Sequence, residues 1–369
     1  REIEPEALAD PNIDIVSSHH YPSPNRSMLE DVERFERQIG GKKVYILGEV
    51  GFVPVKEFRE ILDAVIRKNI SGAMLWSLRY HNRDGGFYWH SEPAGGLLYK
   101  AYHYPGFETG AAYAETELIS LVREKAFEIR GLAVPPLPRP DAPVLLPAKS
   151  ASAISWRGSV GAMGYDVERS FKPKGPWAVV GAKVDDTFVQ YRPLFADESA
   201  EPGHNYYYRV VAKNSTGASP PSNVAGPVRV EEHVIVDELS DYSRTFAHGG
   251  AALSLETTNP RPYKEDAHRL KGSDRDWVTY RSTGSLRSAR VMVFMEDVEK
   301  DFEFYLSQDG EHFTKVEPEI KRFPVAVNPY GYKLPVQYEI AGLASGTHFL
   351  KVVFRTEAQV SRVELRDAR

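Results

Sequence analysis

One glutamate ends a short apolar stretch of the sequence in a position suited to catalysis. Residues 44–51 read VYILGEVG, so Glu49 follows four residues of strand character and stands between Gly48 and Gly51. In enzymes built from alternating strands and helices, catalytic side chains stand at the carboxyl ends of parallel strands. A carboxylate there could act as a nucleophile or as a general acid or base. The alternative is that Glu49 caps the next helix or lies in solvent.

Histidine, tyrosine and tryptophan occur at similar places on either side of this glutamate. His19, His20 and Tyr21 follow one predicted strand, and Trp76 lies on another. A tyrosine hydroxyl and an imidazole N–H that donate to Glu49 would favour its charged, nucleophilic form. An indole face offers apolar stacking to a pyranose ring. The alternatives are a hydrogen-bonded histidine at the rim of the fold and a tryptophan in its core.

A repeated strand–helix pattern must position these residues. Apolar spacing predicts three such pairs within residues 1–130, with strands at 13–18, 44–47 and 73–78 and helices at 24–38, 55–68 and 114–130. Alternating strands and helices predict parallel strands joined by helical crossovers. The polar residues that follow the strands therefore gather at one edge of the sheet.

Three βα units do not close a barrel, which takes eight in typically about 250 residues. An open sheet of three parallel strands would expose apolar side chains and an unpaired edge. We therefore expect residues 1–130 to be the C-terminal part of a (β/α)8 barrel. Its missing N-terminal barrel segment would belong to the same gene product or to a separate chain. The alternative is a small free-standing α/β domain.

A proline-rich linker separates this segment from a first all-β sandwich. Residues 131–147 contain six prolines and predict a semi-rigid connection. In residues 148–228 the apolar pattern alternates every two residues, as in strands. The stretch resembles a fibronectin type III domain on an early Trp156 and on the phrase at 202–214, in which Tyr206 would be the corner tyrosine. Such a module is more often a spacer than a binder.

Residues 229–369 predict a second all-β sandwich. The phrase FYLSQDGEHF at 304–313 and the closing SRVEL at 361–365 look like a galactose-binding-type jelly roll. Domains of that type often bind carbohydrate, and many only pack against a catalytic neighbour. The aromatic residues that could stack on sugars, or could instead pack within the domain, are Tyr263, Trp277, Tyr330 and Tyr332.

Composition argues against several other classes of function. The formal net charge is −5 and the basic residues do not cluster, so no nucleic-acid partner is predicted. No apolar run has the length of a membrane span, and no signal-peptide pattern occurs in this chain. Zero cysteines exclude disulfides and a cysteine nucleophile. Adjacent His19 and His20 would point to opposite faces of a strand, so we expect no metal and no cofactor.

The first segment resembles the last three βα units of family-five-type glycoside hydrolases, endo-β-mannanases in particular. One motif falls in each unit, namely HxYP at 19–22, GExG at 48–51 and LWS at 75–77. The resemblance implies that Glu49 is the nucleophile of a retaining glycosidase. It also implies that His19 and Tyr21 hydrogen-bond the nucleophile or the sugar, and that Trp76 is the floor on which the sugar stacks.

The same resemblance shows what this chain lacks. The general acid/base glutamate and an arginine near the nucleophile belong to earlier strands of the family, and neither motif occurs here. Glu92 is expected to line a subsite rather than to donate a proton, with His20, Trp89 and His90 as further substrate-binding candidates. We therefore expect the purified chain to be inactive, or nearly so.

The predicted protein is a secreted multidomain hydrolase, extracellular or periplasmic, that degrades a plant-type β-glycan. The leading substrate is β-1,4-mannan, a β-linked polysaccharide. The predicted fold is a partial (β/α)8 barrel followed by two all-β sandwiches. One alternative is a non-catalytic carbohydrate-binding or adhesive protein with a barrel remnant. Another is an exo-acting β-glycosidase whose cleft is blocked at one end by the loop at 82–112.

Overall fold

The computed structural model describes residues 2–23, 25–51, 53–87, 90–91, 98–99, 102–107, 114–187, 192–258, 261–263, 266, 268–296, 302–323 and 333–368. The chain divides into two compact units. Unit 1 holds Arg1–Tyr80 and Ala101–Leu137, and unit 2 holds His81–Lys100 and Pro138–Arg369. The polypeptide therefore leaves unit 1 after Tyr80, returns at Ala101 and leaves again after Leu137.

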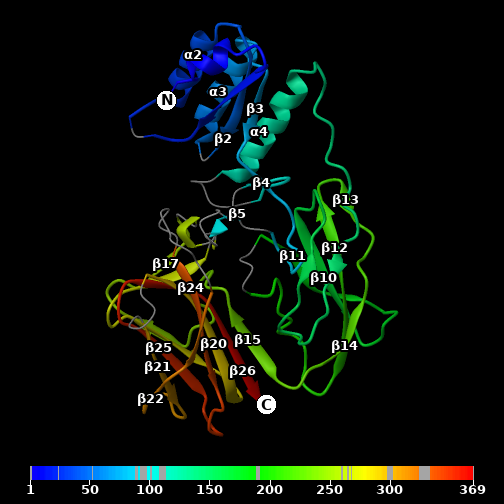
Figure 1. Ribbon diagram of the computed structural model, residues 1–369. Helices are drawn as coiled ribbons and strands as arrows, with labels where there is room; N and C mark the ends of the chain where they lie inside the picture. The colour runs from blue at the N-terminus through cyan, green and yellow to red at the C-terminus, as the bar shows by residue number, and fades with distance from the viewer. Residues whose placement is uncertain are drawn as a thin grey trace. The chain divides into compact units, whose positions relative to one another are not determined.

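Unit 1 is built on three parallel strands in the order β1-β2-β3 (Figure 1). Helix α2 begins and ends at residues that favour helix termini. The Ser27 hydroxyl accepts a hydrogen bond from the backbone N–H of Glu30, and Gly40 ends the helix in the left-handed region. The elements are α1 (Pro5–Ala9), β1 (Ile15–His20), α2 (Met28–Ile39), β2 (Val44–Val50), α3 (Val55–Arg67), β3 (Gly72–Leu75), β4 (Leu78–Arg79), β7 (Tyr102–His103) and α4 (Glu115–Glu128).

The two faces of this sheet differ sharply in exposure. On the face that packs against the helices, alternate residues such as Val16 and Leu47 are buried in the core of the unit. On the opposite face Ile15, Val44 and Met74 are 54%, 43% and 56% exposed. Strands that carry apolar residues on both faces are typical of sheets covered on both sides. Here the second face is open.

The predicted strands and helices of unit 1 overlap those of the structure, and the compact units divide the chain differently at two places. The predicted segment 1–130 includes residues 81–100, which cluster with unit 2 instead. The predicted linker 131–147 is only partly a linker, because Val144–Leu145 forms strand β8 of the first sandwich. The backbone carbonyl of Pro138 also accepts a hydrogen bond from Asn214 Nδ2 at 2.6 Å.

The first sandwich, residues 138–230, packs two layers around a fully buried Trp156. Its main sheet has the order β11-β10-β12-β13, with β14 also paired to β12. The opposite layer holds the β8–β9 pair and a bridge between Ile154 and Phe195. The hydroxyl of Tyr206 accepts a hydrogen bond from the backbone N–H of Glu201, as expected for a corner tyrosine. The strands are β8 (Val144–Leu145), β9 (Trp156–Arg157), β10 (Gly164–Ser170), β11 (Ala178–Val184), β12 (Asn205–Asn214), β13 (Gly217–Ala218) and β14 (Ala225–Arg229).

The second sandwich, residues 233–368, packs two larger antiparallel sheets face to face. One sheet has the order β17-β18-β26-β20-β24-β23 with β15 also paired to β26, and the other has the order β16-β19-β25-β21-β22. The inward residues of both form one hydrophobic core. The strands are β15 (His233–Asp237), β16 (Ala247–Gly249), β17 (Ser254–Glu256), β18 (Arg269–Gly272), β19 (Trp277–Arg281), β20 (Ser285–Met295), β21 (Phe302–Ser307), β22 (Thr314–Val316), β23 (Glu319–Arg322), β24 (Leu334–Ala341), β25 (Phe349–Phe354) and β26 (Ala358–Ala368); a short 3-10 helix spans Arg261–Tyr263, and β5 (His90–Ser91) pairs with β6 (Leu98–Tyr99).

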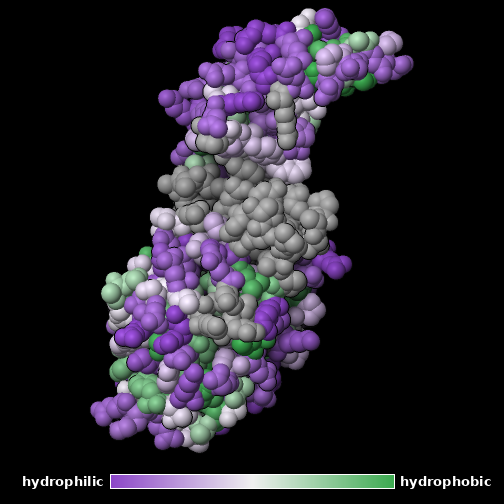
Figure 2. All heavy atoms as spheres, turned by 60° about the vertical axis from the view of Figure 1, so that its left-hand side comes forward, coloured by the Kyte–Doolittle hydropathy of each residue, from purple (hydrophilic) through white to green (hydrophobic). Residues whose placement is uncertain are grey.

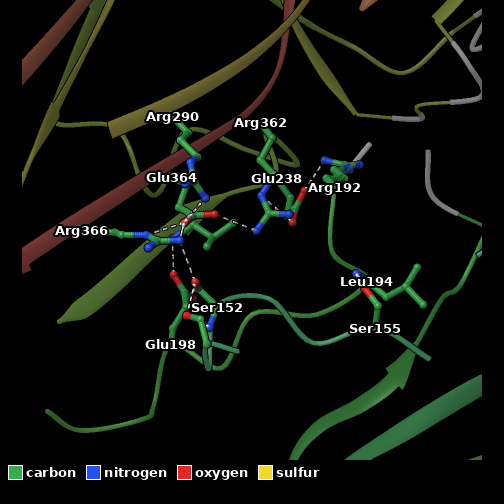
Figure 3. Close-up of polar contacts among 12 residues, drawn as sticks. Ser152, Ser155, Arg192, Leu194, Glu198, Glu238, Arg290, Arg362, Glu364 and Arg366 are labelled. Atoms are coloured by element: carbon green, nitrogen blue, oxygen red, sulfur yellow. Dashed lines mark hydrogen bonds and ion pairs between the residues drawn. The ribbon is translucent and has the colours of Figure 1, made fainter. Parts of the chain in front are cut away.

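Within unit 2 the two sandwiches are joined by charged side chains (Figure 3). Arg192 of the first sandwich lies 2.6 Å from Glu238 and 3.5 Å from Asp266 of the second. Arg366 of the second sandwich donates to the Ser152 hydroxyl of the first at 3.1 Å. The Arg192 side chain is only 4% exposed. The two sandwiches therefore share a buried polar interface.

Hydrophilic side chains cover most of the described surface on the face drawn in Figure 2. None of the helices among the described residues has the length and apolar character needed to cross a membrane.

Candidate active site

Glu49 reaches the open face of the unit 1 sheet because strand β2 contains a bulge. Ser18 of β1 is paired with Leu47 of β2, whereas the next residue, His19, is paired with Glu49. Gly48 is thus the extra residue of β2. Side chains alternate along a regular strand, so if Gly48 were paired as a regular residue, Glu49 would share the helix-covered face with Leu47. A bulge that redirects one side chain is a common feature of functional sites.

The Glu49 carboxylate is in contact with two of the predicted partners. The Tyr21 hydroxyl donates a hydrogen bond to Glu49 Oε2, and His19 Nδ1 lies 3.3 Å from the same oxygen. The Glu49 side chain is 20% exposed, and that of His19 is 51% exposed. The two contacts fix the orientation of the carboxylate, and its partial exposure leaves it accessible to a ligand.

Trp76 follows β3 at the same end of the sheet. Its backbone N–H donates a hydrogen bond of 2.9 Å to the carbonyl of Val50, the residue that follows Glu49 in the sequence. A Cβ atom on Gly51 would lie 2.5 Å from the Trp76 carbonyl oxygen, so this close approach requires glycine. The backbone therefore brings the third predicted motif beside the second. The peptide bond between Trp76 and Ser77 is cis.

His20 does not belong with the substrate-binding residues, which corrects one prediction. It is 3% exposed, on the face opposite Glu49, and packs edge-on against Phe35 of α2 at 5.7 Å between ring centroids. The reason is the alternation of side chains along β1, which places His19 on the open face and His20 beneath it. Burial lowers the pKa of His20 to about 4. His20 is therefore neutral near pH 7.

Of the other predicted site residues, Trp89 and Glu92 lie outside the described residues, and the structure describes His90 only as part of β5. His81, which precedes these residues in the chain, is held by the first sandwich. Its Nε2 lies 3.1 Å from Oδ2 of Asp186, whose side chain is fully buried. His81 is therefore a structural residue of unit 2.

Two polar residues next to the site were missed by the sequence reasoning. Ser18 and Tyr45 are both buried beneath the strands that carry His19 and Glu49. Ser18 Oγ lies 2.6 Å from Tyr45 Oη and 2.6 Å from His20 Nε2. Polar residues at alternate positions on the buried face of β1 could have identified Ser18, whereas Tyr45 lies in β2 and had no such signal.

Two aromatic candidates of the second sandwich, Trp277 and Tyr263, pack against side chains of the same domain. Lys351 Nζ lies 4.4 Å from the ring centroid of Trp277, and the guanidinium of Arg269 lies 4.4 Å from that of Tyr263. Each ring therefore already stacks with a cation of the same domain. Tyr330 and Tyr332 fall outside the described residues. Within the described part of the chain, no group of three His, Asp or Glu side chains could hold a metal ion.

Comparisons with known proteins give only distant similarities. No protein-family model matches the sequence, and no curated protein matches it. A family 6 carbohydrate-binding module from Clostridium stercorarium, solved with cellobiose, is 11% identical with a TM-score of 0.25, covering 36% of this chain and 94% of that one.

Two enzymes show similarity of the same order. A two-domain esterase active on acetylated mannans is 16% identical with a TM-score of 0.25, covering 37% of this chain and 36% of its own. The catalytic domain of a GH87 α-1,3-glucanase is 10% identical with a TM-score of 0.25, covering 37% of this chain and 28% of its own. These values are too low to assign a fold or a ligand, so both depend on the chain's own residues.

Proposed function

We propose that unit 1 carries the nucleophile of a retaining β-glycoside hydrolase that acts on a β-linked plant-type polysaccharide, with β-1,4-mannan as the leading candidate. The observation that carries this proposal is the position of Glu49. It lies at the carboxyl end of a parallel strand, with the Tyr21 hydroxyl and His19 Nδ1 at one of its oxygens. Active sites of (β/α)8 enzymes lie at that end of the strands.

The residues present account for one half of a retaining mechanism. In the first step a charged carboxylate attacks the anomeric carbon and forms a covalent glycosyl-enzyme. Tyr21 and His19 hold Glu49 in place and stabilise its charge until the bond forms. Trp76 would offer an apolar platform to the sugar ring at that subsite. The second carboxyl group, about 5–5.5 Å from the first, protonates the leaving oxygen.

We propose that this second carboxyl group comes from further βα units that complete the barrel, in the same polypeptide or in another chain. The open face of the unit 1 sheet supports this part of the proposal. Ile15, Val44 and Met74 would lie inside such a barrel, where layers of branched and apolar side chains form the core. Because these side chains are already about half buried, complete burial would favour association by roughly 1 kcal/mol each, before the entropic cost of association.

The test uses protein with a complete barrel, assayed on β-mannan and β-glucan oligosaccharides. A 2-deoxy-2-fluoro glycoside of the preferred sugar should trap the glycosyl-enzyme, and mass spectrometry should find the label on the peptide that contains Glu49. Glu49→Gln should lower kcat by several orders of magnitude, because the amide cannot attack the anomeric carbon. Glu60→Gln, at an exposed position of α3, is the matched control and should retain activity.

Two results would contradict the proposal. The first is a label on another carboxylate, and the second is full activity in Glu49→Gln. Unchanged carbohydrate binding together with no hydrolysis by any form of the protein would instead favour the non-catalytic alternative. The purified 369-residue chain is expected to show little or no turnover.

A further inference from the structure

A buried network of hydrogen bonds lies on the face of the sheet opposite the candidate nucleophile. Tyr45 Oη, Ser18 Oγ and His20 Nε2 follow one another at 2.6 Å, and the three residues are 5%, 7% and 3% exposed. Ser18 and His20 belong to β1, and Tyr45 belongs to β2. The chain therefore ties the two strands together through their side chains, in addition to the backbone pairing.

The protonation states give this chain a direction. Burial raises the pKa of Tyr45 to about 12, so its hydroxyl keeps its proton and can donate to Ser18. Burial lowers the pKa of His20 to about 4, so its Nε2 can accept from the Ser18 hydroxyl at neutral pH. The Ser18 hydroxyl then has both a donor and an acceptor. Fully satisfied buried networks of this kind hold their members in one arrangement.

These hydrogen-bonded side chains flank the point where the strand register changes, because Ser18 precedes it and His20 follows it on β1. Val16 and Tyr45 are paired before the bulge, Ser18 and Leu47 are the last regular pair, and His19 and Glu49 are the first pair after it. The His19 ring lies over Gly48, since a Cβ atom there would be 3.2 Å from its Cδ2 and Nε2. The contact between His19 and Glu49 thus depends on a bulge one residue long.

We propose that Ser18, His20 and Tyr45 are positioning residues that hold the Gly48 bulge and thereby keep His19 against Glu49. They touch neither substrate nor the reacting carboxylate. Bulges are local irregularities that a ladder can lose by slipping its register. A one-residue slip would turn Glu49 towards the helices and away from the open face of the sheet. The geometric part of the inference stands on the structure, and its catalytic consequence rests on the proposed function.

The test measures the contact between His19 and Glu49 in the 369-residue chain, without any assay of activity. With histidine labelled isotopically, Glu49→Gln should change the chemical shifts of the His19 ring, because the carboxylate lies 3.3 Å from its Nδ1. Tyr45→Phe removes the hydroxyl and keeps the ring. In that background the effect of Glu49→Gln on the His19 signals should fall to half or less of its original size.

Further variants keep the outcome decisive. Ser18→Ala should reproduce the loss, because it removes the central member of the chain. Tyr102→Phe, at another buried tyrosine of unit 1, is the matched control and should leave the effect of Glu49→Gln unchanged. An unchanged effect in both Tyr45→Phe and Ser18→Ala would overturn the inference, as would an equal loss in Tyr102→Phe, which would indicate general destabilisation.

A kinetic measurement separates this inference from the proposed function. In protein with a complete barrel, Tyr45→Phe should lower kcat by roughly tenfold, since displacement of a catalytic group by a fraction of an ångström is costly. KM should change little. If Glu49→Gln leaves hydrolysis intact, the proposed function fails. The NMR result still decides whether the hydrogen bonds among Tyr45, Ser18 and His20 hold the bulge.

Discussion

At the scale of single residues, two adjacent histidines show how position decides chemistry. His19 and His20 have the same side chain, yet one is half exposed beside a carboxylate and the other is buried beneath the sheet. The alternation of side chains along a strand is the cause. Only His19 can take part in chemistry at Glu49. His20 contributes to stability, and its burial makes that contribution depend on pH.

We predict that unit 1 loses stability on acidification because of His20. Its pKa is about 4 in the folded state and 6.5 when unperturbed, so the unfolded chain binds a proton first as the pH falls. Stability is fully present above pH 6.5 and declines until about pH 4, by about 3 kcal/mol in total. His20→Gln should remove most of this decline. Amide hydrogen exchange of β1 and β2 between pH 4 and 7 measures it.

The exposed neighbour provides the control. His19→Gln should leave the decline below pH 6.5 in place, because the buried ring of His20 is still present. An equally steep decline in His20→Gln would show that other groups in unit 1 carry the pH dependence.

At the scale of elements, the sequence predicts what depends on local spacing and fails where tertiary contacts decide. Helices α2, α3 and α4 were predicted because their apolar residues recur at helical spacing on a single face. The orientation of the Glu49 side chain towards the open face could not be predicted, because it depends on a one-residue bulge at Gly48.

In the first sandwich, strand β11 was also missed, since Ala178–Val184 lacks regular alternation of buried and exposed residues. The corner role of Tyr206 was predicted from its phrase and agrees with its hydrogen bond to Glu201.

The loop that follows Trp76 shows the same limit. Residues 81–87 carry polar and aromatic side chains, which are also common in substrate-binding loops. In the structure Phe87 and Asn82 are buried, and Gly85 packs against Ser155 and the Trp156 carbonyl. The buried Asp186 that pairs with His81 lies far away in the sequence. Only the folded first sandwich brings the two together.

We predict that the first sandwich is destabilised when this pair is broken. His81→Ala should lower the free energy of unfolding by about 2 kcal/mol, because it removes the imidazole that lies 3.1 Å from the buried carboxylate of Asp186. Gly158→Ala should act in the same direction, since its Cβ atom would clash with both His81 and Asp186. The free energy of unfolding is measured by urea denaturation of the full chain, and hydrogen exchange in β10 reports on the first sandwich.

An exposed histidine–carboxylate pair in the same sandwich gives a matched comparison. His204 Nε2 lies 3.9 Å from Glu201 Oε2, with the two side chains 50% and 78% exposed. Solvent screens such a pair, so His204→Ala should change stability by less than about 0.5 kcal/mol. Equal effects of His81→Ala and His204→Ala would contradict a structural role for the buried pair.

At the scale of the whole molecule, the two sandwiches were predicted as separate modules, and their coupling was not. The two-residue alternation marks each sandwich because it reports burial within one sheet. It carries no information on which charged residues meet across a boundary. Arg192 was not singled out by any local pattern, yet it meets two carboxylates of the second sandwich.

We predict that Arg192 couples the unfolding of the two sandwiches. Arg192→Met keeps the length of the side chain and removes its charge, which leaves Asp266, 2% exposed, without that cation. Asp266 retains hydrogen bonds from Ser361 and the His268 N–H. The loss should therefore lie near the lower end of the range for a broken buried ion pair, about 3 kcal/mol. In the native chain both sandwiches should unfold in one transition, and in Arg192→Met the unfolding should separate into two transitions.

Arg355→Met is the control, because the Arg355 side chain is 44% exposed and its guanidinium lies 3.7 Å or more from the nearest carboxylate oxygens. A single, unshifted transition in Arg192→Met would show that the sandwiches are held together by other contacts.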